Sequence, residues 1–134
     1  MTGRKSRALD LLFFTALSLL LCHELDAVAQ SEWRLLPVLS GLDDAAGYLW
    51  FVALHIPLFA LLFWWTSSRA ASTRRTAQLL LDAFMVVHAG LHLALHDRPE
   101  YTFHSPLSEL LIFGAAALAL PHAVLVWREG SHQP

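Results

Sequence analysis

Four long stretches of mostly apolar residues divide the chain. Short polar or charged segments separate them, and each stretch is close to the roughly 20 residues that an α-helix needs to cross a membrane. The pattern therefore predicts an all-α protein, a bundle of four transmembrane helices. The predicted helices cover residues 8–29, 45–65, 76–96 and 105–127.

The composition agrees with a membrane protein. Hydrophobic residues make up 56% of the 134 residues and charged residues only 15%, and the mean hydropathy is +0.49. Because soluble domains carry about 25% charged residues, we exclude that class. The sequence shows no internal repeat, low-complexity segment or long linker, so we expect a single integral membrane domain over residues 1–134.

The basic residues favour one side of the membrane. Short cytoplasmic loops of membrane proteins carry an excess of Lys and Arg, whereas only Arg34 and Arg98 lie in the loops at the opposite side. We therefore expect both termini in the cytoplasm and a multi-pass protein of the bacterial inner (plasma) membrane. The basic residues on the expected cytoplasmic side are Arg4, Lys5, Arg7, Arg69, Arg74, Arg75 and Arg128.

The first apolar stretch has a second interpretation. A basic start, an apolar run and the sequence Ala27-Val28-Ala29 also resemble a secretory signal with its cleavage site. Cleavage there would remove His23 and leave three helices. We take the four-helix interpretation as the expectation.

Four histidines lie inside the predicted helices, namely His23, His55, His88 and His92. Ionisable side chains inside a bilayer are costly, and by default they mark a functional site. At 1.5 Å of rise per residue, the four lie about 6 to 15 Å below the expected outer ends of their helices. Since helix ends are uncertain by two to four residues, the four histidines cannot be told apart in height, and we expect all of them in the outer half of the bundle.

The spacing within each helix favours a shared site. His88 and His92 are four residues apart, so their imidazoles stack on one helix face and could hold one metal ion. His23 and Asp26 are three apart and also share a face. We therefore predict a metal site whose ligands are His23, Asp26, His55, His88 and His92. Imidazole with carboxylate suits Zn, Fe, Cu or Mn, and haem held by histidines of two helices is the alternative cofactor.

Other polar residues of the helices have plainer interpretations. We expect Asp82 to pair with Arg74 or Arg75 near the cytoplasmic surface. For His122 we expect a hydrogen bond between helices. His96 and His104 belong to the solvated outer rim.

One segment carries a family resemblance. His23-Glu24-Leu25-Asp26-Ala27 is followed by Glu32-Trp33-Arg34. This HExDA-type end of the first helix and EWR-type loop resemble a family of small, uncharacterised bacterial four-helix integral membrane proteins. The resemblance implies the fold and the membrane location, and no activity or cofactor.

Three classes of function remain. The first is a metal-dependent membrane enzyme that acts on a lipid, in which the bound ion activates water or oxygen. The second is a haem-binding or redox membrane module, and the third is a non-catalytic transport or assembly subunit whose histidines form hydrogen bonds between helices. Membrane lipids are the expected partners, together with a second copy or another membrane protein. The chain has no P-loop, dinucleotide fingerprint, G-x-S-x-G or CxxC motif, and its net charge of −2 excludes nucleic acid.

Overall fold

The computed structural model describes residues 2–131 of the chain, and these residues form an all-helical structure. Each of the four long helices has the length and composition of a membrane span, so the predicted four-helix fold is confirmed. The elements are α1 (Thr2–Ala29), the short 3-10 helix η1 (Glu32–Arg34), α2 (Asp44–Thr66), α3 (Ala71–Leu95) and α4 (Pro106–Ser131).

The helices extend beyond the apolar stretches at some ends. For example, α3 begins at Ala71 rather than at residue 76, because the apolar pattern marks the part of a helix that contacts lipid, whereas the helix itself continues through polar residues. The starts of α2 and α4 carry side-chain caps. Asp43 accepts a hydrogen bond from the backbone N–H of Ala46, and Ser105 accepts one from that of Ser108.

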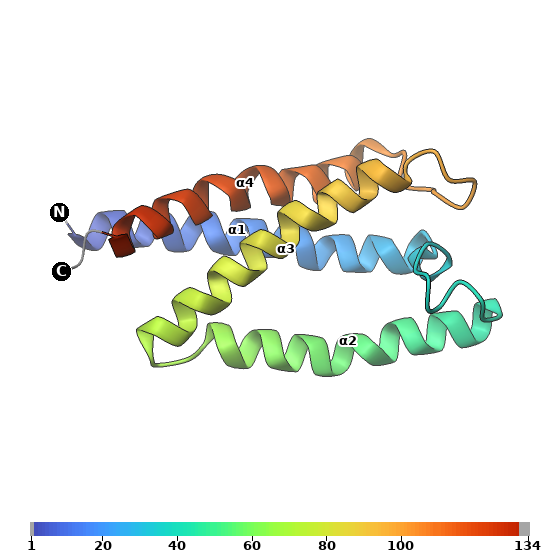
Figure 1. The fold of residues 1–134 in the computed structure, drawn as a ribbon, viewed down its shortest axis with the longest axis horizontal. Helices are drawn as coiled ribbons and strands as arrows, with labels where there is room; N and C mark the ends of the chain where they lie inside the picture. Colours follow the sequence, from blue (N-terminus) through green and yellow to red (C-terminus); the bar gives the residue numbers. More distant parts are fainter. Residues whose placement is uncertain (1, 132–134) are drawn as a thin grey trace.

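The bundle has two distinct ends (Figure 1). Both termini and the α2–α3 connection lie at one end, which we call the terminal end. The segment with η1 and the α3–α4 loop lie at the other, which we call the loop end. Helices α1 and α4 run antiparallel and pack side by side along much of their length.

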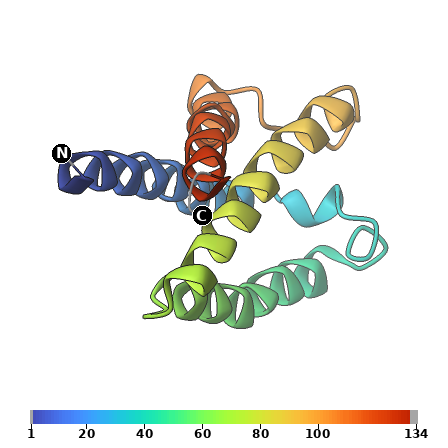
Figure 2. The ribbon, with the colours of Figure 1, turned by 60° about the vertical axis from the view of Figure 1, so that its left-hand side comes forward.

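Helix α3 joins α2 to the rest of the bundle. It crosses obliquely from α2 to the α1–α4 pair (Figures 1 and 2). It packs mainly against α4, and α2 packs against α3 and η1. The outer faces of α2 expose large apolar side chains such as Trp50, Ile56 and Trp64, which suits contact with lipid tails.

Two apolar clusters form the core. The one toward the terminal end contains Leu20 and Met85, and the one toward the loop end contains Ala27 and Ala89. His23 lies between Leu20 and Ala27 along α1, and His88 lies between Met85 and Ala89 along α3. A layer of polar side chains therefore separates the two clusters.

Candidate metal centre

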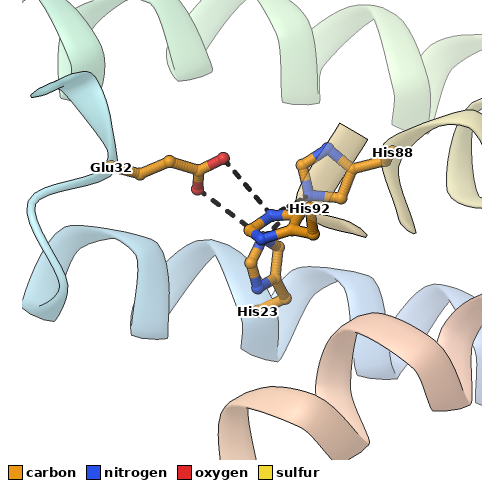
Figure 3. Close-up of side chains that lie close together, drawn as sticks. All are labelled: His23, Glu32, His88 and His92. Carbon is orange, nitrogen blue, oxygen red and sulfur yellow. Dashed lines mark hydrogen bonds and ion pairs between the residues drawn. The ribbon is translucent and has the colours of Figure 1, made fainter. Parts of the chain in front are cut away.

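Four side chains from three elements converge in this polar layer. Each offers one nitrogen or carboxylate oxygen, and these four atoms all lie within 4.8 Å of one another. Figure 3 shows the carboxylate approaching from η1 while the imidazoles approach from α1 and α3. The four residues are His23 of α1, Glu32 of η1, and His88 and His92 of α3. We call them the metal centre.

The ligand atoms face one another closely. Nε2 of His88 lies 2.8 Å from Nε2 of His23 and 3.1 Å from Nε2 of His92. The Glu32 carboxylate lies 3.6 Å from the Nε2 atoms of both His23 and His92. Ligands bound at about 2.0–2.1 Å from a tetrahedral zinc ion stand roughly 3.4 Å apart. The carboxylate contacts match this spacing, and the imidazoles need only small side-chain movements to open to it.

Helix geometry places the two histidines of α3. His88 and His92 are one turn apart, so their imidazole rings meet on the same face, with centroids 4.6 Å apart. That face turns toward α1, where the ring of His23 lies 4.8 Å from that of His88 and 5.0 Å from that of His92. Three imidazoles from two helices thus form a compact group.

A tight turn places Glu32. Helix α1 ends at Ala29, and Ser31 adopts a left-handed backbone conformation with φ 58° and ψ 44°. Among residues 2–131, no other non-glycine residue has a positive φ. Such a conformation is unfavourable for serine, and here it returns the chain over the helix end so that η1 points the Glu32 side chain at the imidazoles.

Trp33 fixes η1 against α2. Its ring packs against Tyr48 and Phe51, with centroid separations of 5.8 and 5.9 Å. It also lies so close to Gly47 that a Cβ atom there would come within 2.5 Å of the Trp33 ring. Glycine is therefore needed at position 47 for this contact, and the contact holds the neighbouring Glu32 in place.

The centre is largely withdrawn from its surroundings. His23 is 1% exposed, His92 3% and Glu32 7%, whereas His88 is only half-buried. Burial alone would raise the pKa of the Glu32 carboxyl. Its contact with His92 and the positive charge that the imidazoles can carry outweigh this effect, and the pKa is lowered from its ordinary value. Glu32 is thus held as a carboxylate, the form that binds a metal ion.

Aromatic side chains of the α3–α4 loop cover the centre. The Phe103 ring packs 5.5 Å from His23 and 4.8 Å from His92. Nδ1 of His92 lies 3.3 Å from the Tyr101 hydroxyl, the kind of second contact that orients a metal-binding imidazole. Nδ1 of His23 is buried with no hydrogen-bond partner among the described residues.

A family model described as "Family of unknown function (DUF6713)" matches residues 9–129, which includes all four residues of the metal centre. The chain belongs to this family. No curated protein matches the chain, and no solved structure does. Membership of an uncharacterised family is therefore confirmed, while a bacterial origin and the significance of the HExDA and EWR segments stay predictions.

The structure of this DUF6713 protein brings together three of the five residues predicted as ligands, His23, His88 and His92. His55 lies in a different contact. Its Nδ1 donates to the backbone oxygen of Phe51 at 2.6 Å, and its Nε2 lies 2.9 Å from the Glu24 carboxylate, so that it joins α1 to α2.

Asp26 also lies outside the four-residue group. Gln30 donates to its Oδ1 at 3.4 Å, and its Oδ2 is buried without a partner among the described residues. Sequence reasoning missed Glu32 as a ligand, because it lies in the loop after the first helix, outside every predicted helix. The EWR-type segment, singled out for its resemblance, already contained it.

The DUF6713 chain has a further buried ionisable pair. Asp82 pairs with His122. The predicted pairing of Asp82 with Arg74 or Arg75 is therefore wrong. Arg75 instead donates to the backbone oxygen of Val126 at 2.9 Å. The expected hydrogen bond between helices at His122 is confirmed, and its partner is the aspartate of α3.

Proposed function

We propose that this DUF6713 protein binds one divalent transition-metal ion between the helices of its membrane bundle. The convergence of three imidazole nitrogens and one carboxylate carries the proposal. The ligands are Nε2 of His23, His88 and His92 and the carboxylate of Glu32.

The donor set favours particular metals. Imidazole suits Zn, Fe and Cu, and a carboxylate extends the choice to Mn, whereas Ca²⁺ and Mg²⁺ prefer sites made of oxygen. A haem is less well supported, because Nε2 of His88 lies 2.8 Å from Nε2 of His23 and 3.1 Å from that of His92. A porphyrin ring between two axial imidazoles needs a planar slot, and contacts this short leave none between these rings.

The number of side chains that converge at the centre argues against helix packing as its only role. A membrane histidine that only packs needs one partner on another helix. Here three imidazoles meet around one point, and a carboxylate is turned into the same point by a strained serine conformation. Strain of this kind persists where the surrounding structure enforces it, often at functional sites.

Lipid-directed chemistry is the second candidate, and one observation favours it. The side chains around His23 and His88 are apolar, Leu20, Met85 and Leu111 among them, and they leave no room for a water molecule between them. His88 is half-buried and stacks on the exposed Phe84 ring. An acyl chain that packs on this apolar side could therefore contact the exposed edge of His88. A bound ion would polarise a carbonyl or phosphoryl oxygen or activate a water molecule.

The same arrangement supports a membrane orientation. Arg7 lies in the first turns of α1, Arg69 in the α2–α3 connection and Arg75 in the first turns of α3, so all three lie at or near the terminal end. With the excess of basic residues in cytoplasmic loops, we place the termini in the cytoplasm of a bacterium and the metal centre in the outer half of its plasma membrane.

Metal analysis of the protein purified in detergent tests the proposal. We expect close to one transition-metal ion per chain, and replacing His23 and His92 together by alanine should abolish it. His55→Gln is the matched control, because it removes an imidazole predicted as a ligand but keeps a donor for Glu24. A metal content near zero in the wild type after reconstitution, or a content that His55→Gln abolishes and the His23/His92 variant retains, contradicts this ligand set.

A further inference from the structure

Two more histidines meet at the loop end, outside the metal centre. The rings of His96, at the end of α3, and His104, before α4, lie 5.0 Å apart. Oδ1 of Asp97 lies 3.5 Å from Nδ1 of His96. The His96 side chain is 50% exposed, and His104 and Asp97 are exposed as well. We call His96 and His104, with Asp97 beside them, the rim pair.

Tyr101 connects the rim pair to the metal centre. Its ring lies 5.3 Å from that of His96 and 5.2 Å from that of His104. On its other side it packs 5.7 Å from the ring of His92, and its hydroxyl lies 3.3 Å from Nδ1 of that histidine. One buried side chain therefore separates an exposed pair of imidazoles from a ligand of the buried centre.

We propose that the rim pair is a second, weaker metal site that captures a divalent transition-metal ion at the loop end and supplies it to the metal centre past Tyr101. This inference rests on the proposed function of the centre. The rim pair continues the stripe of α3 that carries the centre, because His96, directly after the end of α3, follows His88 and His92 at intervals of four residues.

The chemistry of the rim pair suits a capture step. It offers the same imidazole and carboxylate donors as the centre, so an ion of the same kind prefers it over an all-oxygen surface. It has two imidazoles where the centre has three, and water completes the coordination, so the ion leaves more readily. Because the ligands of the centre are mostly buried, an ion must lose its water before it arrives, and an exposed site allows this exchange in stages.

Cobalt(II) binding to the full-length protein in detergent tests the inference, because Co²⁺ bound to nitrogen ligands absorbs visible light. We expect a tight and a weak equivalent in the wild type. The double variant His96→Ala/His104→Ala should lose the weak equivalent and fill the centre roughly tenfold more slowly, since a captured cation raises its local concentration. Its final tight equivalent should match that of the wild type.

The matched control is Glu100→Gln, which alters the charge of the same exposed loop without touching an imidazole. It should load at the rate of the wild type. Unchanged loading in the His96/His104 variant, or equal slowing in Glu100→Gln, overturns the inference while leaving the metal centre intact. If the wild type shows no tight equivalent, the proposed function itself has failed, and the His23/His92 variant then binds as the wild type does.

Discussion

Nδ1 of His122 lies 2.7 Å from Oδ2 of Asp82, and both side chains are 1% exposed. The pair joins α4 to α3 in the part of the bundle closer to the terminal end. The second carboxylate oxygen of Asp82 is buried without a hydrogen-bond partner among the described residues. Asp82 therefore depends on His122 for the side-chain hydrogen bond that the described residues offer it.

Breaking this pair should destabilise the bundle. His122→Ala leaves the carboxylate of Asp82 buried without a partner, and we expect a loss of about 3–5 kcal/mol of unfolding free energy. Replacing both residues by leucine should recover much of that loss, because no charge then remains buried. Thermal unfolding in detergent measures both, and the metal content should stay unchanged in the refolded double variant. Equal losses in the single and double variants contradict the pairing.

The contact between Trp33 and Gly47 gives a second prediction. In Gly47→Ala the new Cβ atom meets the Trp33 ring at 2.5 Å, so the ring must move and η1 must shift with it. We expect a loss of about 1–3 kcal/mol in stability from overpacking. Metal affinity should fall as well, because the adjacent Glu32 moves away from the imidazoles.

Gly90→Ala is the control for that substitution. Gly90 also lies in a helix, but no atom lies within 4 Å of a Cβ placed there. Alanine should raise stability by up to about 1 kcal/mol through its higher helix propensity and leave metal binding unchanged. Thermal unfolding and cobalt titration of the two variants decide the matter. A Gly47→Ala protein with the metal affinity of the wild type shows that Trp33 does not position Glu32.

The sequence predicts the fold better than it predicts the site, for a physical reason. Apolar stretches of membrane-spanning length leave few alternatives to a helical bundle, and helix periodicity alone places His88 beside His92. The rotation of one helix relative to another is set by packing between helices. For this reason His55 faces Glu24 instead of the centre, although its depth fits.

Glu32 could not be predicted as a ligand from local pattern. Its position depends on the left-handed conformation of Ser31 and on the contact of Trp33 with Gly47. The left-handed conformation is rare for serine. The contact between Trp33 and Gly47 joins η1 to α2, and neither of these elements carries His88 or His92. Neither the conformation nor the contact leaves a periodic signal in the sequence.

The metal centre should release its ion on mild acidification. Imidazoles must be neutral to bind a metal, and their ordinary pKa is about 6.5. The pKa of Glu32 is held below its ordinary value, so its carboxylate persists below the ordinary range of a glutamate. Because the bound ion competes with protons for the imidazoles, we expect release below about pH 6.5, at a pH that falls as the free metal concentration rises. Equilibrium dialysis with Zn²⁺ at two free-ion concentrations measures it, and a release pH that is the same at both contradicts this competition.

Added metal should stabilise the protein through the four residues of the centre. An ion that binds only the folded state at 100 times its dissociation constant adds about 2.7 kcal/mol to the free energy of unfolding. Zn²⁺ added to chelator-treated protein should therefore raise the unfolding temperature, and a chelator should reverse the rise. Glu32→Gln keeps the size of the side chain but removes its charge, and we expect metal affinity to fall by at least about tenfold. The rise in temperature should shrink accordingly. If Glu32→Gln shows the full rise and His55→Gln shows none, the ion binds at the contact between α1 and α2 rather than beneath η1.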